Sequence, residues 1–352
     1  MAGVVRAAKD AVKSIGGIIR LGAKESRFLE SVLEDRFLSF GAEPTNICDA
    51  MCPFCAYRYS KETKRIMPLD IFERAVEEYH SVGGGGINLT PTIGEPLMDR
   101  TIIDKIRIAK ARPGINNIFF YSNLLNLRKV GAERLLTSGI RRISVSTALG
   151  SKEMYARLFG VDRYETMLAN LIELLETNIR LRRPVSIILA LRFDDTFDYK
   201  NSADYRKISD LMNGRNITHL PNERGYDNWG GVIQEEDLPK GASFRRGAGK
   251  KKEPCAELYR RINVLADGRV NFCVCRDFKH EMVIGNIRDN GLLDVWRGEP
   301  MRKIREDWKS GKVPEMCLRC SMYTPLSEFL RKSRLSIWML WKRIKDAGIA
   351  RR

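Results

Sequence analysis

The segment CDAMCPFC, residues 48–55, places three of the chain's eight cysteines on one short stretch. A structural zinc site takes four protein ligands, and this segment supplies three, because the next cysteine is residue 255. An iron–sulfur cluster held by three thiolates keeps one iron open for a substrate or cofactor. The spacing C-x3-C-x2-C therefore favours an open cluster at Cys48, Cys52 and Cys55, with a zinc site or merely buried thiols as the alternatives.

Strand-like and helix-like patterns alternate along the chain from about residue 38. Six apolar stretches are typical of strands: residues 37–43, 86–92, 117–123, 141–149, 185–193 and 216–222. Amphipathic stretches between them are typical of helices: residues 68–82, 101–111, 129–139, 164–182 and 205–214. This alternation predicts an α/β fold with a parallel sheet, which we expect to be a partial (β/α)6 TIM-like barrel. The cysteine segment follows the first strand, at the edge where such sheets bind ligands.

Composition divides the chain into five parts. Residues 1–37 carry two short helical patterns and precede the predicted barrel, residues 38–233. Residues 234–254 have no periodicity and are rich in charge, glycine and proline, so we expect a linker with a solvated basic run. The last five cysteines fall within residues 255–325, which predicts a second, smaller domain. Residues 326–352 have the pattern of a basic amphipathic helix.

The overall composition is that of a globular protein with basic ends. The 352 residues are 43% hydrophobic and 30% charged, with a formal net charge of +17. Residues 1–27 supply +4 of this charge and residues 331–352 supply +7, so the 303 residues between them carry only +6. A nucleic-acid partner is therefore not expected. Neither a membrane-spanning run of about 18 apolar residues nor a signal peptide is evident, which predicts a cytoplasmic protein with reduced thiols.

The motif C-x3-C-x-(aromatic)-C after the first strand resembles that of the radical S-adenosylmethionine (SAM) superfamily, with Phe54 at the aromatic position. The resemblance implies that the three cysteines hold a 4Fe-4S cluster that binds S-adenosylmethionine, and that Phe54 lies beside its adenine. In TPTIGEPLMD, the turn Gly94, Glu95 and Pro96 is similar to the family's GGE turn, which binds the amino group of the cofactor methionine. Here Ile93 stands in place of the first glycine.

Further strand ends carry softer matches to the family. Ser122 and Asn123, in YSNLL, resemble its TNG turn. Ser146 and Thr147 end the fourth strand, where hydroxyls often hold the carboxylate or ribose of the cofactor. Arg157 is similar to a helix arginine that pairs with that carboxylate, a task suited to a bidentate guanidinium.

Four residues near later strand ends are candidates for the cavity. Arg192, which we also expect to contact the cofactor, and Asp194 end the fifth strand, while His219 and Trp229 follow further along. For these residues, as for the softer matches, ordinary capping or a surface ion pair is the alternative. No motif identifies what they bind.

The second group of cysteines has the spacing C-x12-G-x4-C, followed by the pair CLRC. The Asp-Gly dipeptide between alternating apolar residues predicts a tight hairpin. This segment resembles the shortened auxiliary-cluster domain, called twitch, of the SPASM branch of the superfamily. The resemblance implies one auxiliary 4Fe-4S cluster and leaves Cys275 as a spare thiol; its ligands would be Cys255, Cys273, Cys317 and Cys320. A zinc ribbon built from the same four cysteines is the alternative.

The resemblance implies an enzyme that cleaves S-adenosylmethionine reductively and abstracts a hydrogen atom from a substrate, with an electron donor such as a flavodoxin or ferredoxin. The auxiliary cluster fits oxidation of a sugar-type, cyclitol-type or lipid-linked small molecule. Modification of a peptide is the enzymatic alternative, although 37 residues before the barrel are too few for the leader-binding domain of many peptide-modifying relatives. A zinc-bearing interaction protein is the non-enzymatic alternative.

The basic ends suggest a surface contact. At the C-terminus, Ile337, Leu340, Trp341 and Ile344 share one helical face, with Trp338 at its border. Such a helix can lie on an anionic membrane surface. The alternative is that both ends pack onto the barrel with their charges in solvent.

Overall fold

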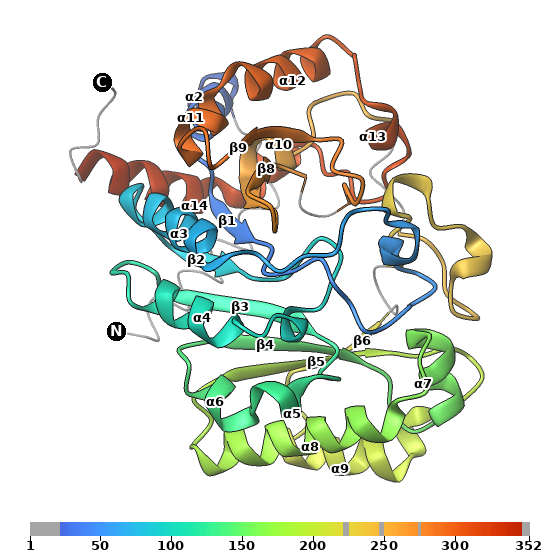
Figure 1. Cartoon of the computed structure of the whole chain (residues 1–352). Coiled ribbons are helices and arrows are strands. Elements are labelled where there is room, and N and C mark those ends of the chain that lie inside the picture. The colour runs from blue at the N-terminus through green and yellow to red at the C-terminus, as the bar shows by residue number, and fades with distance from the viewer. Residues whose placement is uncertain (1–21, 221–224, 246–249, 274–275, 347–352) are drawn as a thin grey trace.

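The computed structural model describes residues 22–220, 225–245, 250–273 and 276–346. The first helical pattern of the sequence analysis and Cys275 lie outside these ranges. Within them, one sheet has nine strands in the order β6-β5-β4-β3-β2-β1-β7-β8-β9 (Figure 1).

The first six strands are mutually parallel, as predicted. Each lies within one of the six stretches expected from the sequence. Their bounds are β1 (Ser39–Ala42), β2 (Gly86–Asn88), β3 (Asn117–Ser122), β4 (Arg142–Thr147), β5 (Ser186–Arg192) and β6 (Ile217–Leu220). The carboxyl ends of these strands therefore meet along one edge, which is where the first cysteine segment begins.

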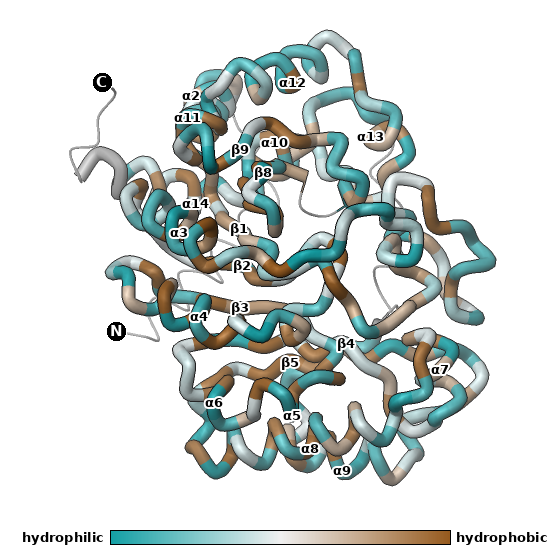
Figure 2. Tube along the Cα trace, in the orientation of Figure 1, coloured by the Kyte–Doolittle hydropathy of each residue, from teal (hydrophilic) through white to brown (hydrophobic). Residues whose placement is uncertain are grey.

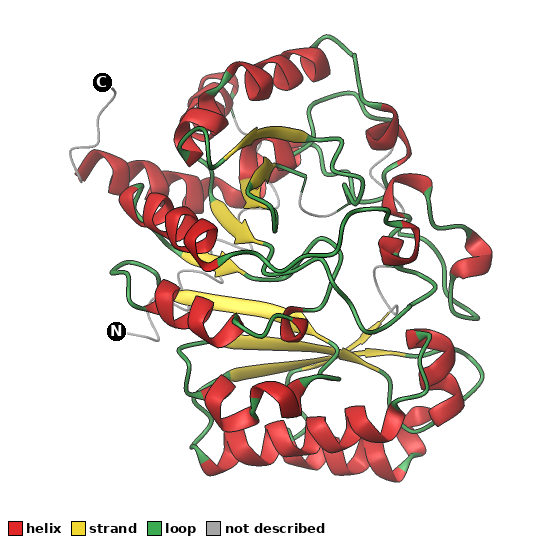
Figure 3. Cartoon of the chain, in the orientation of Figure 1, coloured by secondary structure: helices red, strands yellow, loops and turns green. Residues whose placement is uncertain are grey.

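One helix precedes β1, and the other helices of this region follow the strands and pack beside the sheet (Figure 3). They are α2 (Ala23–Asp35), α3 (Leu69–Ser81), α4 (Ile102–Lys110), α5 (Leu127–Val130), α6 (Ala132–Leu136), α7 (Lys152–Phe159), α8 (Tyr164–Arg180) and α9 (Ala203–Leu211). The prediction of one helix over residues 129–139 is wrong. Gly131, with φ of 88°, separates α5 from α6, because that left-handed backbone interrupts the helix.

The cysteine-rich C-terminal region continues the same sheet. β7 (Arg261–Val264) pairs in parallel with β1, on the side opposite β2. β8 (Arg269–Asn271) and β9 (Val283–Asn286) follow as antiparallel strands. The predicted hairpin is present, with Gly268 at φ of 92° between β7 and β8. The predicted boundary at residue 255 is thus not a break in the hydrogen-bonded sheet.

Helices complete this region, and short 3-10 turns connect the elements. The helices are α10 (Glu257–Arg260), α11 (Leu292–Arg297), α12 (Glu299–Lys309), α13 (Glu315–Arg319) and α14 (Leu326–Asp346). The 3-10 turns are η1 (Ala56–Tyr59), η2 (Pro96–Met98), η3 (Tyr199–Asn201), η4 (Trp229–Gly231) and η5 (Glu235–Asp237). Hydrophobic residues concentrate on the strands and on the helix faces against them, which gives one main core (Figure 2).

The C-terminal helix packs on the protein through the face that the sequence analysis offered to a membrane. Ile337 is fully buried, and Leu340 packs against the main core. The Trp341 ring lies 5.5 Å from the ring of Phe28 on α2. For this face the expectation of a membrane contact is wrong, because its apolar area is already covered by α2. The side chain of Ile344 lies outside the described residues.

A fully buried ion pair ties the loop after β1 to the loop after β2. Lys105, on α4, donates from Nζ to Asp99 Oδ2 at 2.5 Å, and both side chains are 0% exposed. The same Nζ lies 3.4 Å from the carbonyl oxygen of Pro44 and 3.2 Å from Oγ1 of Thr101. These bonds satisfy a charge that burial would otherwise penalise heavily.

Replacing Lys105 by Met should therefore lower the free energy of unfolding by about 3–5 kcal/mol, because it leaves Asp99 buried without its partner. Urea denaturation measures this loss. The matched control is Lys152→Met. Lys152 pairs with Glu165 at 2.7 Å on the exposed surface, so this variant should leave the midpoint of urea denaturation unchanged. Equal midpoints for the two variants would contradict a stabilising role for the buried pair.

Candidate functional site

The three cysteines of residues 48–55 lie on the loop between β1 and η1. Tyr57, in η1, closes this loop on itself. Its hydroxyl accepts a hydrogen bond from the backbone nitrogen of Cys48 at 3.0 Å and donates one to the Cys48 carbonyl at 3.1 Å. The backbone nitrogen of Cys55 donates to the Cys52 carbonyl at 3.1 Å. The thiols are thus carried by a loop with a defined backbone.

The end of α7 presses directly on this loop. The backbone nitrogen of Met51 donates to the Phe159 carbonyl at 2.9 Å. The next residue, Gly160, ends the helix with φ of 68°, and a Cβ there would lie 2.3 Å from the Met51 carbonyl oxygen. Only glycine allows both the left-handed backbone and this close approach.

Asp49 anchors the cysteine loop to the end of β3. Its carboxylate accepts hydrogen bonds from the side-chain amides of Asn123 at 2.9 Å and Asn126 at 2.5 Å. Arg163 pairs with it at 3.3 Å. Of these four residues, only Asn123 is predicted from the sequence as a site residue. The place of Asp49 inside the cysteine motif is the signal that could have found it.

The predicted turn at residues 94–96 meets the end of β3. The buried carboxylate of Glu95 accepts from Oγ of Ser122 at 2.6 Å and from the backbone nitrogen of Asn123 at 2.8 Å. It also caps η2, which begins at Pro96, by accepting from the backbone nitrogen of Leu97. Burial raises the pKa of Glu95 to about 7, and these hydrogen bonds act in the opposite direction.

Gly94 is held close to the loop that leads into the cysteine motif. Its φ is 134°, and a Cβ would lie 2.7 Å from the carbonyl oxygen of Thr45. The backbone nitrogen of Glu95 donates to the Ile47 carbonyl at 2.8 Å. The turn and the cysteine loop are therefore neighbours, and the role of the turn toward a cofactor stays a prediction.

Arg192 brings together residues from three segments. Its Nε donates to Oγ of Ser146 at 3.0 Å. Its guanidinium lies 4.5 Å from the ring centre of Phe54 and 5.3 Å from that of Tyr226. The structure thus places Phe54, Ser146 and Arg192 in one group. Tyr226 completes it, and no sequence pattern marked that residue.

Two predicted cofactor contacts have other partners in the structure. The hydroxyl of Thr147 donates to the backbone carbonyl of Ala148 at 3.4 Å. The Arg157 side chain is half exposed and pairs with Asp194 at 3.0 Å, with Thr196 as a further acceptor. Arg157 therefore forms the ion pair that was the alternative to a cofactor contact. The role of Arg157 toward a cofactor stays a prediction.

The cysteines of the first loop are partly buried and lie near cations. Burial raises the pKa of Cys52 to about 12 and also raises the pKa values of Cys48 and Cys55. The guanidinium of Arg192 lowers the pKa of Cys52 and Cys55, and that of Arg276 also acts on Cys55. Three soft ligands facing two cations suit an anionic iron–sulfur cluster. Within the described ranges, no group of three or more His, Cys, Asp or Glu side chains is close enough together to hold a metal ion.

Cys320 lies near two other cysteines of the second group, Cys255 and Cys317. Cys255 forms a β-bridge with Pro325. Burial raises the pKa of Cys255 and of Cys317 to about 12, and the Cys320 thiol, which lies close to both, raises them further. The backbone nitrogen of Cys273 donates to the side chain of Asn271 at 2.6 Å. The set of four ligands inferred from the sequence stays a prediction.

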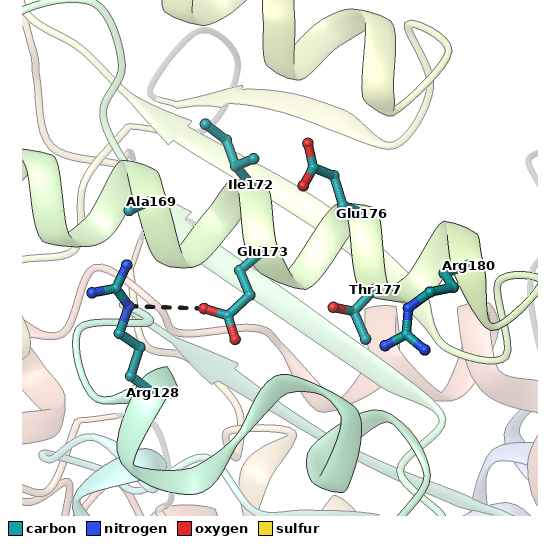
Figure 4. Close-up of a pocket in the computed structure, with 7 residues that line it drawn as sticks. All are labelled: Arg128, Ala169, Ile172, Glu173, Glu176, Thr177 and Arg180. Carbon is teal, nitrogen blue, oxygen red and sulfur yellow. Dashed lines mark ion pairs between the residues drawn. The ribbon is translucent and has the colours of Figure 1, made fainter.

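The remaining cavity candidates are dispersed. His219 contacts the hydroxyl of Tyr199, and Trp229 contacts the first cysteine loop. A surface pocket along α8 lies apart from them; in it Arg128 pairs with Glu173 at 3.8 Å (Figure 4). The pocket is lined by Arg128, Ala169, Ile172, Glu173, Glu176, Thr177 and Arg180, none of which is a predicted site residue.

A buried glutamate joins the three strand ends around the first cysteine loop. Glu43 directly follows β1. Its carboxyl group accepts from the backbone nitrogen of Thr92 at 3.1 Å, and its own backbone nitrogen donates to the Val264 carbonyl at 2.8 Å. Burial raises the pKa of Glu43 to about 8, an effect that the bond from Thr92 only partly offsets.

Glu43 should make stability fall as the pH rises. The folded protein keeps this proton up to about pH 8, whereas the unfolded chain releases it near the ordinary value of 4.5. The contribution of Glu43 is therefore complete below pH 4.5 and declines by about 1.4 kcal/mol per pH unit up to about pH 8. Urea denaturation at several pH values should show a shallower decline for Glu43→Gln, which cannot ionise. Parallel curves for the two proteins would refute this assignment.

Sequence comparisons match both halves of the chain. Residues 42–203 match the model of the radical SAM superfamily, and residues 255–321 match an iron–sulfur cluster-binding domain, SPASM. The GTP 3′,8-cyclase of Synechococcus elongatus is 25% identical over 244 residues, covering 65% of this chain and 72% of that protein. The GTP 3′,8-cyclase of Lactiplantibacillus plantarum is 22% identical over 53% of this chain and 55% of its own length.

Structure comparisons match the fold. BtrN in complex with AdoMet and 2-DOIA has a TM-score of 0.55 at 18% identity, covering 83% of this chain and 96% of BtrN. SuiB of Streptococcus suis, bound to the precursor peptide SuiA, has a TM-score of 0.58 at 14% identity, covering 86% of this chain and 73% of SuiB. These likenesses confirm the predicted fold class. No helix among the described residues is long and apolar enough to cross a bilayer.

Proposed function

We propose, from the premise that the chain belongs to the radical SAM superfamily and carries a SPASM domain, that it takes a hydrogen atom from a small molecule. The substrate would be a sugar-type, cyclitol-type or lipid-linked molecule, which the enzyme would oxidise or otherwise modify. The observation that carries the proposal is the meeting of three groups at the carboxyl ends of parallel strands. These groups are the partly buried thiols of residues 48–55, the Glu95 turn and the Arg192 cluster.

In this proposal Cys48, Cys52 and Cys55 hold a 4Fe-4S cluster and the neighbouring strand ends hold S-adenosylmethionine. When bound, the cluster would supply the electron that cleaves the cofactor to a 5′-deoxyadenosyl radical. A one-electron donor such as a flavodoxin or ferredoxin would provide that electron.

The protein residues would bind and orient the cofactor. The turn of residues 94–96, with Ser122 and Asn123, would receive the methionine amino group, since Glu95 offers a buried carboxylate there. Ser146 and Arg192 would receive polar groups of the cofactor, and Phe54 would lie beside the adenine. The ring of Phe54 packs 4.9 Å from that of Tyr226, and this apolar pair would exclude water from a radical.

We assign one auxiliary 4Fe-4S cluster to the second group of ligands: Cys255, Cys273, Cys317 and Cys320. The thiol of Cys320 influences those of Cys255 and Cys317, which supports a shared site. When bound, an auxiliary cluster would accept the electron that a substrate loses on oxidation. Peptide modification is the alternative function, because the same fold holds 2-DOIA in BtrN and a precursor peptide in SuiB.

Anaerobic reconstitution tests the cluster assignment. Wild-type protein should bind about eight irons, as expected for two 4Fe-4S clusters, and should form 5′-deoxyadenosine when reduced with S-adenosylmethionine. Cys52→Ala should keep about four irons and form no 5′-deoxyadenosine. Cys320→Ala should also lose about four irons but keep the first cluster. Zinc in place of iron, or cofactor cleavage by Cys52→Ala, would sink the proposal.

We also propose that the cytoplasmic protein contacts an anionic membrane through the outer face of α14. Leu335, Trp338 and Met339 are 51%, 44% and 52% exposed and share a face by their spacing of three and four residues. Lys332 and Lys342 are exposed on the same helix. Apolar side chains bordered by cations suit the surface of an anionic bilayer.

Co-sedimentation with vesicles tests this contact. The wild-type protein should bind vesicles that contain phosphatidylglycerol, and the double variant Trp338→Ser, Met339→Ser should bind at least tenfold less. Ile179→Ser, which changes an exposed apolar residue on α8, is the control and should bind like the wild type. Equal binding by all three proteins would argue against α14 as the contact.

A further inference from the structure

The short segment Asp227–Trp229 connects the two cysteine regions. It follows β6 and leads into η4. On one side, the indole Nε1 of Trp229 donates to the carbonyl oxygen of Phe54 at 3.1 Å. That carbonyl lies between Cys52 and Cys55, so the indole is bonded to the backbone of the first cysteine loop.

On its other side, the segment holds the backbone around Cys320. The side chain of Asn228 donates to the Arg319 carbonyl at 2.7 Å and accepts from the backbone nitrogen of Ser321 at 3.0 Å. The backbone nitrogen of Asn228 donates to Oγ of Ser321 at 3.0 Å. Both neighbours of Cys320 are thus fixed by one asparagine.

A cation lies over this segment. Asp227 accepts from Oγ of Ser321 at 2.9 Å and pairs with Arg276, whose guanidinium lies 4.8 Å from the ring centre of Trp229. Burial lowers the pKa of Arg276 to about 10, and the thiols of Cys320 and Cys55 act in the opposite direction. Arg276 is therefore near cysteines of both regions.

Packing supports the same connection. Trp229 and Val232 contact a small apolar cluster, separate from the main core, that contains Ala56, Ile93 and Phe278. Ala56 follows the last cysteine of the first loop, Ile93 precedes the Glu95 turn, and Phe278 belongs to the C-terminal region. This cluster buries apolar surface only where all these segments meet.

The backbone of the segment adopts uncommon angles. Trp229 has φ of 49°, which is rare for a bulky residue, and Gly230 follows with φ of 67°. A Cβ on Gly230 would lie 2.5 Å from Cγ of Met316, on α13. A left-handed tryptophan persists only where its surroundings compensate for the strain, and here the compensation comes from both cysteine regions.

We propose that Asp227, Asn228 and Trp229 are positioning residues that fix the first cysteine loop relative to the loop of Cys320, so that a change at one loop alters the other. The proposal rests on the proposed function, since it assigns an iron–sulfur cluster to each loop. The segment touches both loops through separate side chains. Each half of the connection can therefore be cut by one substitution.

The experiment uses reconstituted full-length protein and electron paramagnetic resonance of the reduced clusters. The first-cluster signal is the one that S-adenosylmethionine shifts, and the remaining signal is auxiliary. Asn228→Ala, which contacts only the Cys320 loop, should change the first-cluster signal. Trp229→Phe, which keeps an aromatic ring but loses the bond to the Phe54 carbonyl, should change the auxiliary signal. Trp229→Phe should slow 5′-deoxyadenosine formation about fivefold, as for one lost hydrogen bond, and Asn228→Ala, which loses two, should slow it by at least as much.

Trp308→Phe is the matched control. Trp308 is buried in the C-terminal region, and its indole nitrogen has no hydrogen-bond partner among the described residues, so both signals should stay as in the wild type. Signals altered only at the loop that each variant touches, at full iron content, would overturn the inference. If Asn228→Ala loses its auxiliary cluster, the test of the inference rests on Trp229→Phe alone. An unchanged auxiliary signal in Trp229→Phe would then overturn the inference. A wild-type protein that assembles no cluster would instead refute the proposed function.

Discussion

The pairing of β1 on both of its edges is the constraint on which the rest of the structure depends. β1 bonds in parallel to β2 on one side and to β7 on the other. The loop that leaves its carboxyl end therefore emerges between the barrel strands and the cysteine-rich region. Glu43, the first residue after the strand, bonds to the backbone of both neighbours and so keeps the three strand ends level. The pairing of β1 on both edges therefore determines where the cysteine loop lies.

Much of this arrangement could be predicted from local sequence patterns. The spacing of Cys48, Cys52 and Cys55 and the alternation of strands with helices are local features, and the fold they predict is confirmed. The pairing of β7 with β1 could not be predicted in the same way. Residues 39 and 261 meet because of the whole topology, and no periodicity carries that information.

The site residues also divide into those that local sequence predicts and those that depend on the whole topology. Glu95, Ser122 and Asn123 meet because short loops at successive strand ends converge, which the order of elements already implies. Asp49 and Tyr226 escaped notice because an isolated aspartate or tyrosine has no pattern. Their importance depends on partners far along the chain. Gly131 was available as a helix-ending signal, but apolar spacing on both sides of it suggested one helix.

Electrostatics connect the thiols with their surroundings. Burial favours protonated thiols, whereas a bound cluster requires thiolates. Cluster assembly would therefore release protons from the cysteine loop. Arg192 and Arg276 reduce the cost of the resulting negative charge, because each lowers the pKa of a first-loop thiol.

The long separation in sequence between β1 and β7 also affects folding while the protein is synthesised on the ribosome. After β1 emerges, its second neighbour appears only when the chain has grown from residue 39 to residue 261. At about 5–20 residues per second, this takes on the order of tens of seconds. During that time the nascent barrel presents an unpaired strand edge, the kind of surface on which chains associate wrongly. The C-terminal region thus pairs with the free edge of β1 as well as supplying cysteines, and chaperone protection of the growing chain would matter most before residue 261 is made.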